Sequence, residues 1–79
     1  MNRKLIDVLA SVFDVPHNQI NTDLSKEDVG NWDSLKQMDL VISIEHEFEV
    51  VLEMQDIARM DSFKNIKRVL VSKGIDFGD

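Results

Sequence analysis

Apolar residues recur at helical spacing in the first part of the chain. They are Leu5, Ile6, Val8, Leu9, Val12 and Phe13. A spacing of three to four residues places them on one face of a helix. Asn2 can cap its start, and Pro16 ends it, because the residue before a proline is pushed away from helical angles. We therefore expect a first helix over about residues 2–14.

A polar stretch without any period follows, from residue 16 to residue 33. A loop of this length is uncommon in a small domain and usually has a role or is held down. Its apolar residues stand singly, and we expect Ile20 and Leu24 to reach into the core and pin it.

The strongest periodic segment begins at Asp33-Ser34. Its apolar residues trace a broad stripe: Leu35, Met38, Val41, Ile42, Ile44 and Phe48. Ser34 and Gln37 have the Ser-x-x-Gln spacing of a capping box, which predicts that Ser34 caps the helix. We expect this helix over about residues 34–49.

The last third of the chain predicts two more helices. Residues 50–52 would suit a strand, but no partner strand exists, so we expect an extended turn and then a short helix at about 55–60. Ser62 can cap a final helix over about 62–73, which Gly74 can end, and residues 75–79 are expected to fray. The predicted fold class is all-α: one domain over residues 1–79, a four-helix bundle with a short third helix and a long loop between helices one and two.

Composition narrows the function. The chain has 79 residues, 43% of them hydrophobic, and no cysteine, so its stability must come from apolar burial in a small core. A substrate cleft is hard to build from so little core, and His17 and His46 are not placed to activate Ser34. We therefore expect no catalytic residues and no metal site. The protein is not expected to be an enzyme.

Net charge and hydropathy limit the kinds of partner that this protein can have. A net charge of −6 argues against nucleic acid and suits contact with basic protein surfaces. No stretch approaches the roughly 20 apolar residues of a membrane span. Asp7 interrupts the apolar run after the basic N-terminus, so no signal peptide is expected and we interpret the protein as a cytoplasmic monomer.

The residues around Ser34 carry a family resemblance. Gly30-Asn31-Trp32-Asp33-Ser34-Leu35, followed by Met38-Asp39-Leu40-Val41 and by residues 44–48, resembles the acyl carrier protein family. The similarity extends over nearly the whole chain. It implies that a phosphopantetheinyl transferase attaches a 4′-phosphopantetheine arm from coenzyme A to Ser34, with Asp33 and Leu35 as the flanking recognition motif. The arm would carry an acyl or aminoacyl cargo as a thioester.

The acidic second helix suggests where partners dock. Residues 33–53 contain six acidic residues and one basic residue, Lys36. A solvated face is the usual explanation for such acids. The resemblance instead implies docking of acyl-loading, condensing or acyl-transfer enzymes through basic patches. The candidate partner-binding residues are Trp32, Lys36, Met38, Asp39, Glu45 and Glu47.

Two of these candidates have a second interpretation. Met38 could be an adaptable surface contact or part of the core. Trp32 could anchor a partner, or it could pack over the loop and the first helix, which we prefer.

Several positions differ from the pattern of housekeeping fatty-acid carriers. They are Trp32, Lys36, His46, Glu49 and the basic residues of the last helix, Lys64, Lys67, Arg68 and Lys73. We expect these bases to offset the acidic second helix within the fold. The differences favour a carrier for one specialised pathway over the main fatty-acid carrier, with polyketide biosynthesis as another possible setting. The alternative function is a non-enzymatic acidic adaptor in which Ser34 is only a helix cap.

Overall fold

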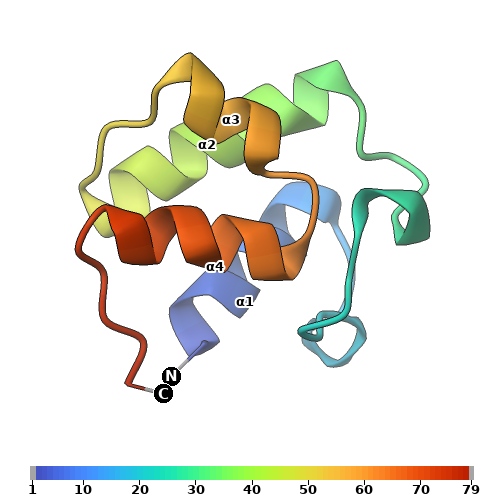
Figure 1. Ribbon diagram of the computed structural model, residues 1–79. Helices are drawn as coiled ribbons and strands as arrows, with labels where there is room; N and C mark the ends of the chain where they lie inside the picture. Colours follow the sequence, from blue (N-terminus) through green and yellow to red (C-terminus); the bar gives the residue numbers. More distant parts are fainter. Residues whose placement is uncertain (1, 79) are drawn as a thin grey trace.

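The computed structural model describes residues 2–78 and forms a helical bundle (Figure 1). Its helices are α1 (Arg3–Phe13), α2 (Ser34–Phe48), α3 (Met54–Arg59) and α4 (Phe63–Ser72). The predicted all-α fold is confirmed, and every helix lies within one residue of its predicted bounds. Within residues 2–78 there is no helix of the length and hydropathy that crossing a membrane requires.

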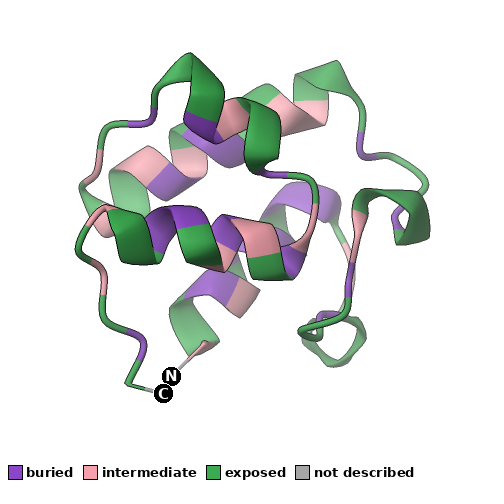
Figure 2. Cartoon of the chain, viewed as in Figure 1, coloured by how far each residue is buried: buried purple, intermediate pink, exposed green. Residues whose placement is uncertain are grey.

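The core lies where α1, α2 and α4 face one another (Figure 2). Its most deeply buried side chains are Leu5, Leu9, Phe13, Leu40, Ile44, Met60, Phe63, Ile66 and Leu70. Within each helix these residues recur at intervals of three or four, so they form one stripe per helix. Burial of such side chains contributes about 1.5–3 kcal/mol each relative to exposure, which makes this cluster the main source of stability.

Two short 3₁₀ turns, η1 (His17–Gln19) and η2 (Lys26–Asp28), lie in the long connection between α1 and α2. Ile20 and Leu24 are buried between and beside them, as predicted. The connection is also tied to the start of α4, because the Phe63 N–H donates to the Leu24 carbonyl at 2.9 Å. The loop is therefore held in place by both apolar and backbone contacts.

The segment after α4 is ordered, contrary to the prediction that it frays. Phe77 is buried, and its ring centroid lies 6.1 Å from that of Phe48. Ile75 also packs against the core. An aromatic side chain near the end of the chain can thus cover the C-terminal end of α2, although residue 79 lies outside the described residues.

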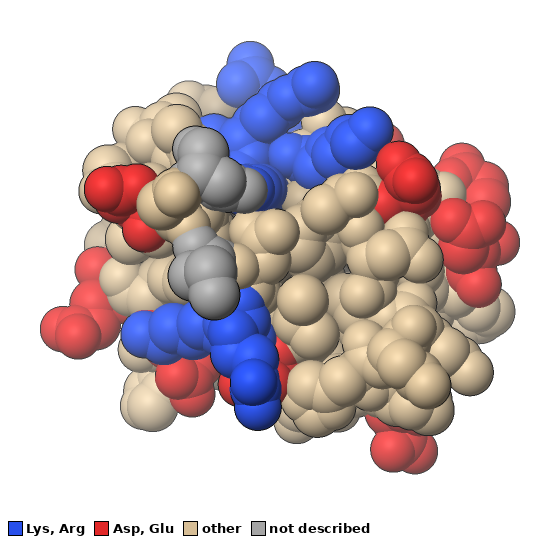
Figure 3. Space-filling view, turned by 90° about the horizontal axis from the view of Figure 1, so that it is seen from below, with Lys and Arg blue, Asp and Glu red and all other residues tan. Residues whose placement is uncertain are grey.

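Two lysines in and after α4, Lys64 and Lys73, form ion pairs with acids outside α2. Lys64 pairs with Asp23 in the long connection, and Lys73 pairs with Glu53 and Asp56, so neither of these two lysines pairs with an acid of α2. Figure 3 shows Lys and Arg side chains gathered in two groups on one face, with acids mostly near its rim. The ion pairs of Lys64 and Lys73 therefore join α4 and its C-terminal end to the long connection and to the start of α3, and the expected offset of the acidic segment is met in these contacts only at Glu53.

α3 contributes little apolar burial. Ile57 is half-buried, whereas Met54 and Ala58 are exposed. A helix of six residues is not stable by itself in water, so its place in the fold depends on contacts with the other helices.

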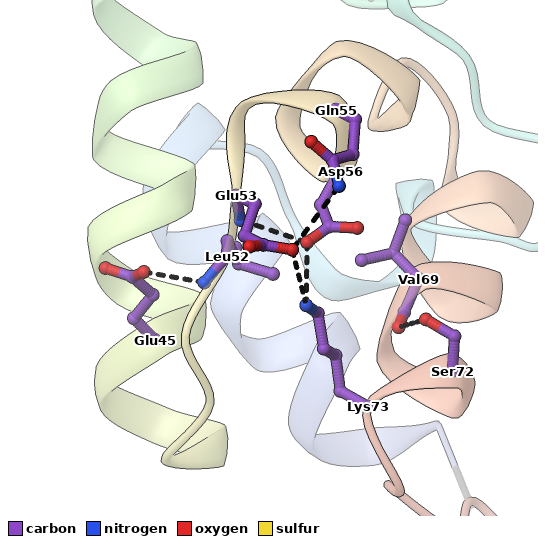
Figure 4. Close-up of polar contacts among 8 residues, drawn as sticks. All are labelled: Glu45, Leu52, Glu53, Gln55, Asp56, Val69, Ser72 and Lys73. Carbon is purple, nitrogen blue, oxygen red and sulfur yellow. Dashed lines mark hydrogen bonds and ion pairs between the residues drawn. The ribbon is translucent and has the colours of Figure 1, made fainter.

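A carboxylate and an ammonium hold the N-terminal end of α3 (Figure 4). Asp56 is buried, and its Oδ2 accepts the Glu53 N–H at 2.9 Å and the Lys73 ammonium at 2.8 Å. The hydrogen bond from Lys73, followed by that from the Glu53 N–H, lowers the pKa of Asp56 below its ordinary 3.8. The same bond to Asp56 raises the pKa of Lys73. Lys73 thus joins the end of α4 to the start of α3.

Replacing Lys73 with Met should destabilise the fold most at neutral pH. Because the pKa of folded Asp56 is lowered, its ionisation stabilises the fold above pH 3.8, and this contribution is lost as pH falls through the folded pKa. The raised pKa of Lys73 places the loss at the alkaline side above about 10.5. Urea unfolding of wild type and Lys73→Met should therefore differ most between these limits, and the difference should shrink below pH 3.8.

Lys64→Met is the matched control, because it removes one ammonium from an exposed pair of the kind that contributes little. A difference between wild type and Lys73→Met that stays constant from pH 7 to pH 3 would contradict this account of the Asp56 pair.

Candidate functional site

The start of α2 is defined by Asp33. This residue has extended backbone angles, and its Oδ1 accepts the Lys36 N–H at 2.9 Å, which is the geometry of an N-cap. The first backbone bond of the helix, from the Gln37 N–H to the Asp33 carbonyl, is 2.8 Å. Ser34 is therefore the first residue inside the helix, and the prediction that Ser34 is the cap is wrong. The side chain of Asp33 or of Ser34 could have capped the helix, and Asp33 accepts the N–H of the first turn.

The Ser34 hydroxyl is left available as a consequence. Ser34 is exposed, and its hydroxyl has no hydrogen bond within the described part of the chain. The N–H groups in the first turn of a helix have no intrahelical partner, and together with the helix dipole they favour an anion there. A phosphate bonded to this hydroxyl would lie at a position that suits its charge. The residues present thus fit a phosphodiester-linked group.

Ser34 has no activating base beside it. His17 is in the connection after α1, where its Nε2 lies 2.8 Å from Asp7 Oδ1. His46 is on α2, three turns beyond Ser34. Across residues 2–78 no cluster of acids and histidines could hold a metal ion. A serine hydroxyl without a base is a weak nucleophile, so any reaction at Ser34 would need a second protein to supply the base.

Trp32 lies underneath the site and not on its surface. Only 4% of it is exposed, and its ring centroid is 4.6 Å from that of Phe13. Its indole N–H donates to Gln37 Oε1 at 2.6 Å. The packing interpretation of Trp32 is confirmed, and its assignment as a partner-binding residue is wrong because the ring is not accessible. Gln37, expected in a capping box, instead accepts this bond.

Two more candidate partner residues are engaged within the fold. The Lys36 ammonium donates to the Val12 carbonyl at 3.0 Å, where it satisfies the C-terminal end of α1. Glu45 accepts the Leu52 N–H at 2.9 Å and so holds the turn that leads to α3 (Figure 4). These charges stabilise a helix end and a turn, and both side chains are half-buried. Their contact with a partner stays a prediction.

Glu47 is exposed but belongs to another side of α2. It lines a shallow hollow together with Lys4 and Ser11 of α1. At 100° per residue it lies well away from Leu35 and Ile42 around the helix axis.

The outward side of α2 carries an apolar stripe beside acids. Leu35 is 77% exposed, Ile42 61% and Met38 50%, and their i, i+3, i+7 spacing places them on one face. Asp39 and His46 are exposed on the same face. We call these five residues the α2 face. Met38 is a surface residue, and Leu35 and Ile42 of the predicted stripe also face outward.

Ile42 is the residue of this face that sequence reasoning missed. α2 carries apolar residues on two sides, and only one of them meets the bundle. A second apolar stripe on a helix with one buried face was the signal that could have identified it.

The comparisons with known proteins agree with this site. Residues 3–70 match the family model described as the phosphopantetheine attachment site. The fold is similar to the solution NMR structure of a holo acyl carrier protein from Geobacter metallireducens, with a TM-score of 0.78 and 21% identity over 92% of this chain and 86% of that chain. No curated protein matches the chain significantly.

The chain therefore belongs to the family of phosphopantetheine-bearing carrier proteins. It is a carrier domain with a covalently attached 4′-phosphopantetheine as its cofactor, and it is not an enzyme. The phosphopantetheine supplies the thiol that carries a cargo, since the chain has no cysteine of its own.

The assignment of the cap can be tested by comparing two alanine variants. Asp33→Ala removes the acceptor for the Lys36 N–H and should lower the free energy of unfolding by about 1 kcal/mol. Ser34→Ala removes a hydroxyl without a partner and should change it by less than about 0.5 kcal/mol. Urea unfolding followed by circular dichroism measures both. A larger loss for Ser34→Ala than for Asp33→Ala would return the capping role to Ser34.

Proposed function

We propose that Ser34 is the attachment point of the phosphopantetheine arm. In this reaction the Ser34 oxygen attacks the phosphate that bears the pantetheine in coenzyme A and gives its proton to a base of the transferase. The pyrophosphate bond of coenzyme A breaks, adenosine 3′,5′-bisphosphate leaves with a metal ion held by the transferase, and Ser34 keeps the phosphopantetheine as a phosphodiester. The observation that carries the proposal is that Asp33 caps α2, so the Ser34 hydroxyl is exposed at the first residue of the helix without a competing bond. Asp33 and Leu35 flank it, and Leu35 is the more exposed of the apolar residues of the α2 face.

The serine at the start of α4 supports the proposal by contrast. Ser62 also follows an aspartate, but it is the cap of its helix, half-buried, and its Oγ accepts the Asn65 N–H at 3.1 Å. A hydroxyl used in this way is not available for transfer. The dipeptide Asp-Ser thus occurs in two different environments in this chain. Of the two serines, Ser34 is the one that fits a modification site.

The α2 face is the surface that we propose for docking of the successive enzymes. Exposed apolar residues grouped on one face usually mark a contact site. Met38 can adapt to several partners, while Asp39 can meet a basic patch through contacts that are weakened by salt. Weak, salt-sensitive contact suits a carrier that must leave one enzyme for the next.

We also propose a specialised biosynthetic pathway. The support comes from contacts around Ser34 made by residues at which this chain differs from housekeeping carriers. Trp32 is bonded to Gln37 below the site, and Lys36 is bonded to α1. His46 adds a titratable group to the α2 face. These features change the surroundings of the arm, and with them the enzymes that would fit there. The cargo would be an acyl or aminoacyl group held as a thioester.

Intact-mass measurement tests the attachment point. After incubation with coenzyme A and a broad-specificity phosphopantetheinyl transferase, wild type should gain one phosphopantetheine and Ser34→Ala none. Ser34→Ala still contains Asp61-Ser62, so it serves as its own control for the dipeptide. A gain by Ser34→Ala would refute the attachment point and favour modification elsewhere; no gain by folded wild type would favour the adaptor alternative.

Alanine variants of the α2 face test the docking surface. Leu35→Ala and Ile42→Ala should each lower kcat/KM of the transferase by about tenfold, because truncating an anchor at an interface costs more than 1 kcal/mol. Val71→Ala is the control, since Val71 is 54% exposed on α4 and away from this face. Equal effects from all three variants would show that the α2 face has no special role in docking.

A further inference from the structure

The side-chain amide of Gln37 joins three parts of the fold. Its Oε1 accepts the indole N–H of Trp32 at 2.6 Å, and its Nε2 donates to the carbonyls of Ile57 at 3.0 Å and of Met60 at 3.1 Å. Only the NH₂ group can donate to two carbonyls and only the oxygen can accept from an indole, so the partners fix the orientation of the amide. One planar group thus links the segment before Ser34, α2 and the C-terminal end of α3.

The bonds to Ile57 and Met60 matter because α3 has few other supports. The last carbonyls of a helix have no intrahelical N–H donors. Gln37 donates to the Met60 carbonyl and adds a second donor to the Ile57 carbonyl, which also accepts the Met60 N–H. At the N-terminal end of α3 the Asp56–Lys73 ion pair links the helix to the end of α4. With so little apolar burial in α3, these polar contacts decide where the helix lies.

The bond from Trp32 matters because its N–H is buried. A buried indole N–H without a partner is unfavourable, so Trp32 keeps its place against Phe13 only while Gln37 faces it. Trp32 is two residues before Ser34, and the intervening residue is the cap of α2. The orientation of Trp32 therefore bears directly on the segment that presents Ser34.

We propose that Gln37 is a positioning residue that couples the place of α3 to the segment that presents Ser34. The inference rests on the proposed attachment of the arm to Ser34. Displacement of α3 removes both acceptors of the Gln37 NH₂ group, the amide is released, and Trp32 loses its acceptor. The segment around Asp33 then loosens, and an enzyme that acts at Ser34 meets a different geometry. Coupling of this kind is reciprocal, so a change at Trp32 must also loosen α3.

Gln37→Glu is the first test variant, because a carboxylate still accepts from Trp32 but cannot donate to the two carbonyls. Hydrogen exchange of the amides of residues 54–60 should become about tenfold faster, and Trp32 emission should shift. Arm transfer by a purified broad-specificity transferase should lose about fivefold in kcat/KM. Gln19→Glu makes the same chemical change at an exposed position of η1 and should alter none of these.

Trp32→Phe is the second variant and tests reciprocity. It keeps a ring against Phe13 and adds no charge, but it removes the indole N–H. Coupling requires faster exchange in residues 54–60 and slower arm transfer here too, although α3 itself is unchanged. If urea unfolding shows that Gln37→Glu does not fold, Trp32→Phe tests the coupling by itself.

The coupling is refuted if Trp32→Phe leaves both α3 exchange and arm transfer at wild-type values. In that case the bonds of Gln37 are two separate structural contacts. Failure of wild type to accept the arm would instead refute the attachment at Ser34, and the exchange of α3 in the two variants would still measure the coupling.

Discussion

α2 begins where the Asp33 carboxylate accepts the Lys36 N–H, and this hydrogen bond fixes which residue is the first of the helix. Successive side chains along the helix are rotated by 100°, so apolar residues of α2 can face two different sides. In the observed phase Leu40 and Ile44 enter the core while Leu35 and Ile42 face outward. The same bond leaves the Ser34 hydroxyl without a partner. The cap therefore leaves the hydroxyl of the first helical residue available, while burial of one face of α2 leaves the α2 face outward, beside that hydroxyl.

A small core leaves α3 dependent on polar contacts. The Asp56–Lys73 pair holds one end of α3, and Gln37 holds the other. Directional bonds of this kind either form or break, whereas apolar packing yields gradually. Because Gln37 also accepts from Trp32, the helix least supported by burial is connected to the residues beside Ser34. A carrier that serves several enzymes in turn has a use for such a connection.

The helices were predictable because apolar residues recur at helical spacing within each of them, and because Pro16 and Gly74 mark the ends of the first and the last helix. Which of two adjacent residues caps α2 was not, because Asp33 and Ser34 are both good caps and only the backbone geometry selects one. The packing of Trp32 against the first helix was predicted, but its bond to Gln37 and the contacts of Lys36 and Glu45 were beyond the sequence. Their partners lie on other elements, and charge or aromatic character alone does not distinguish a surface contact from an internal one. The exposure of Ile42 was not predicted either, because an apolar stripe does not show which of its members face the bundle.

Asp33 caps α2. In the function that we propose, the Ser34 hydroxyl accepts the arm and another protein supplies the base. Fragmentation mass spectrometry of the protein after reaction with coenzyme A and a transferase tests this most directly. The account predicts phosphopantetheine on Ser34 and on no other serine. Its presence on Ser62, which also follows an aspartate at a helix start, would contradict the claim that capping decides which hydroxyl is available.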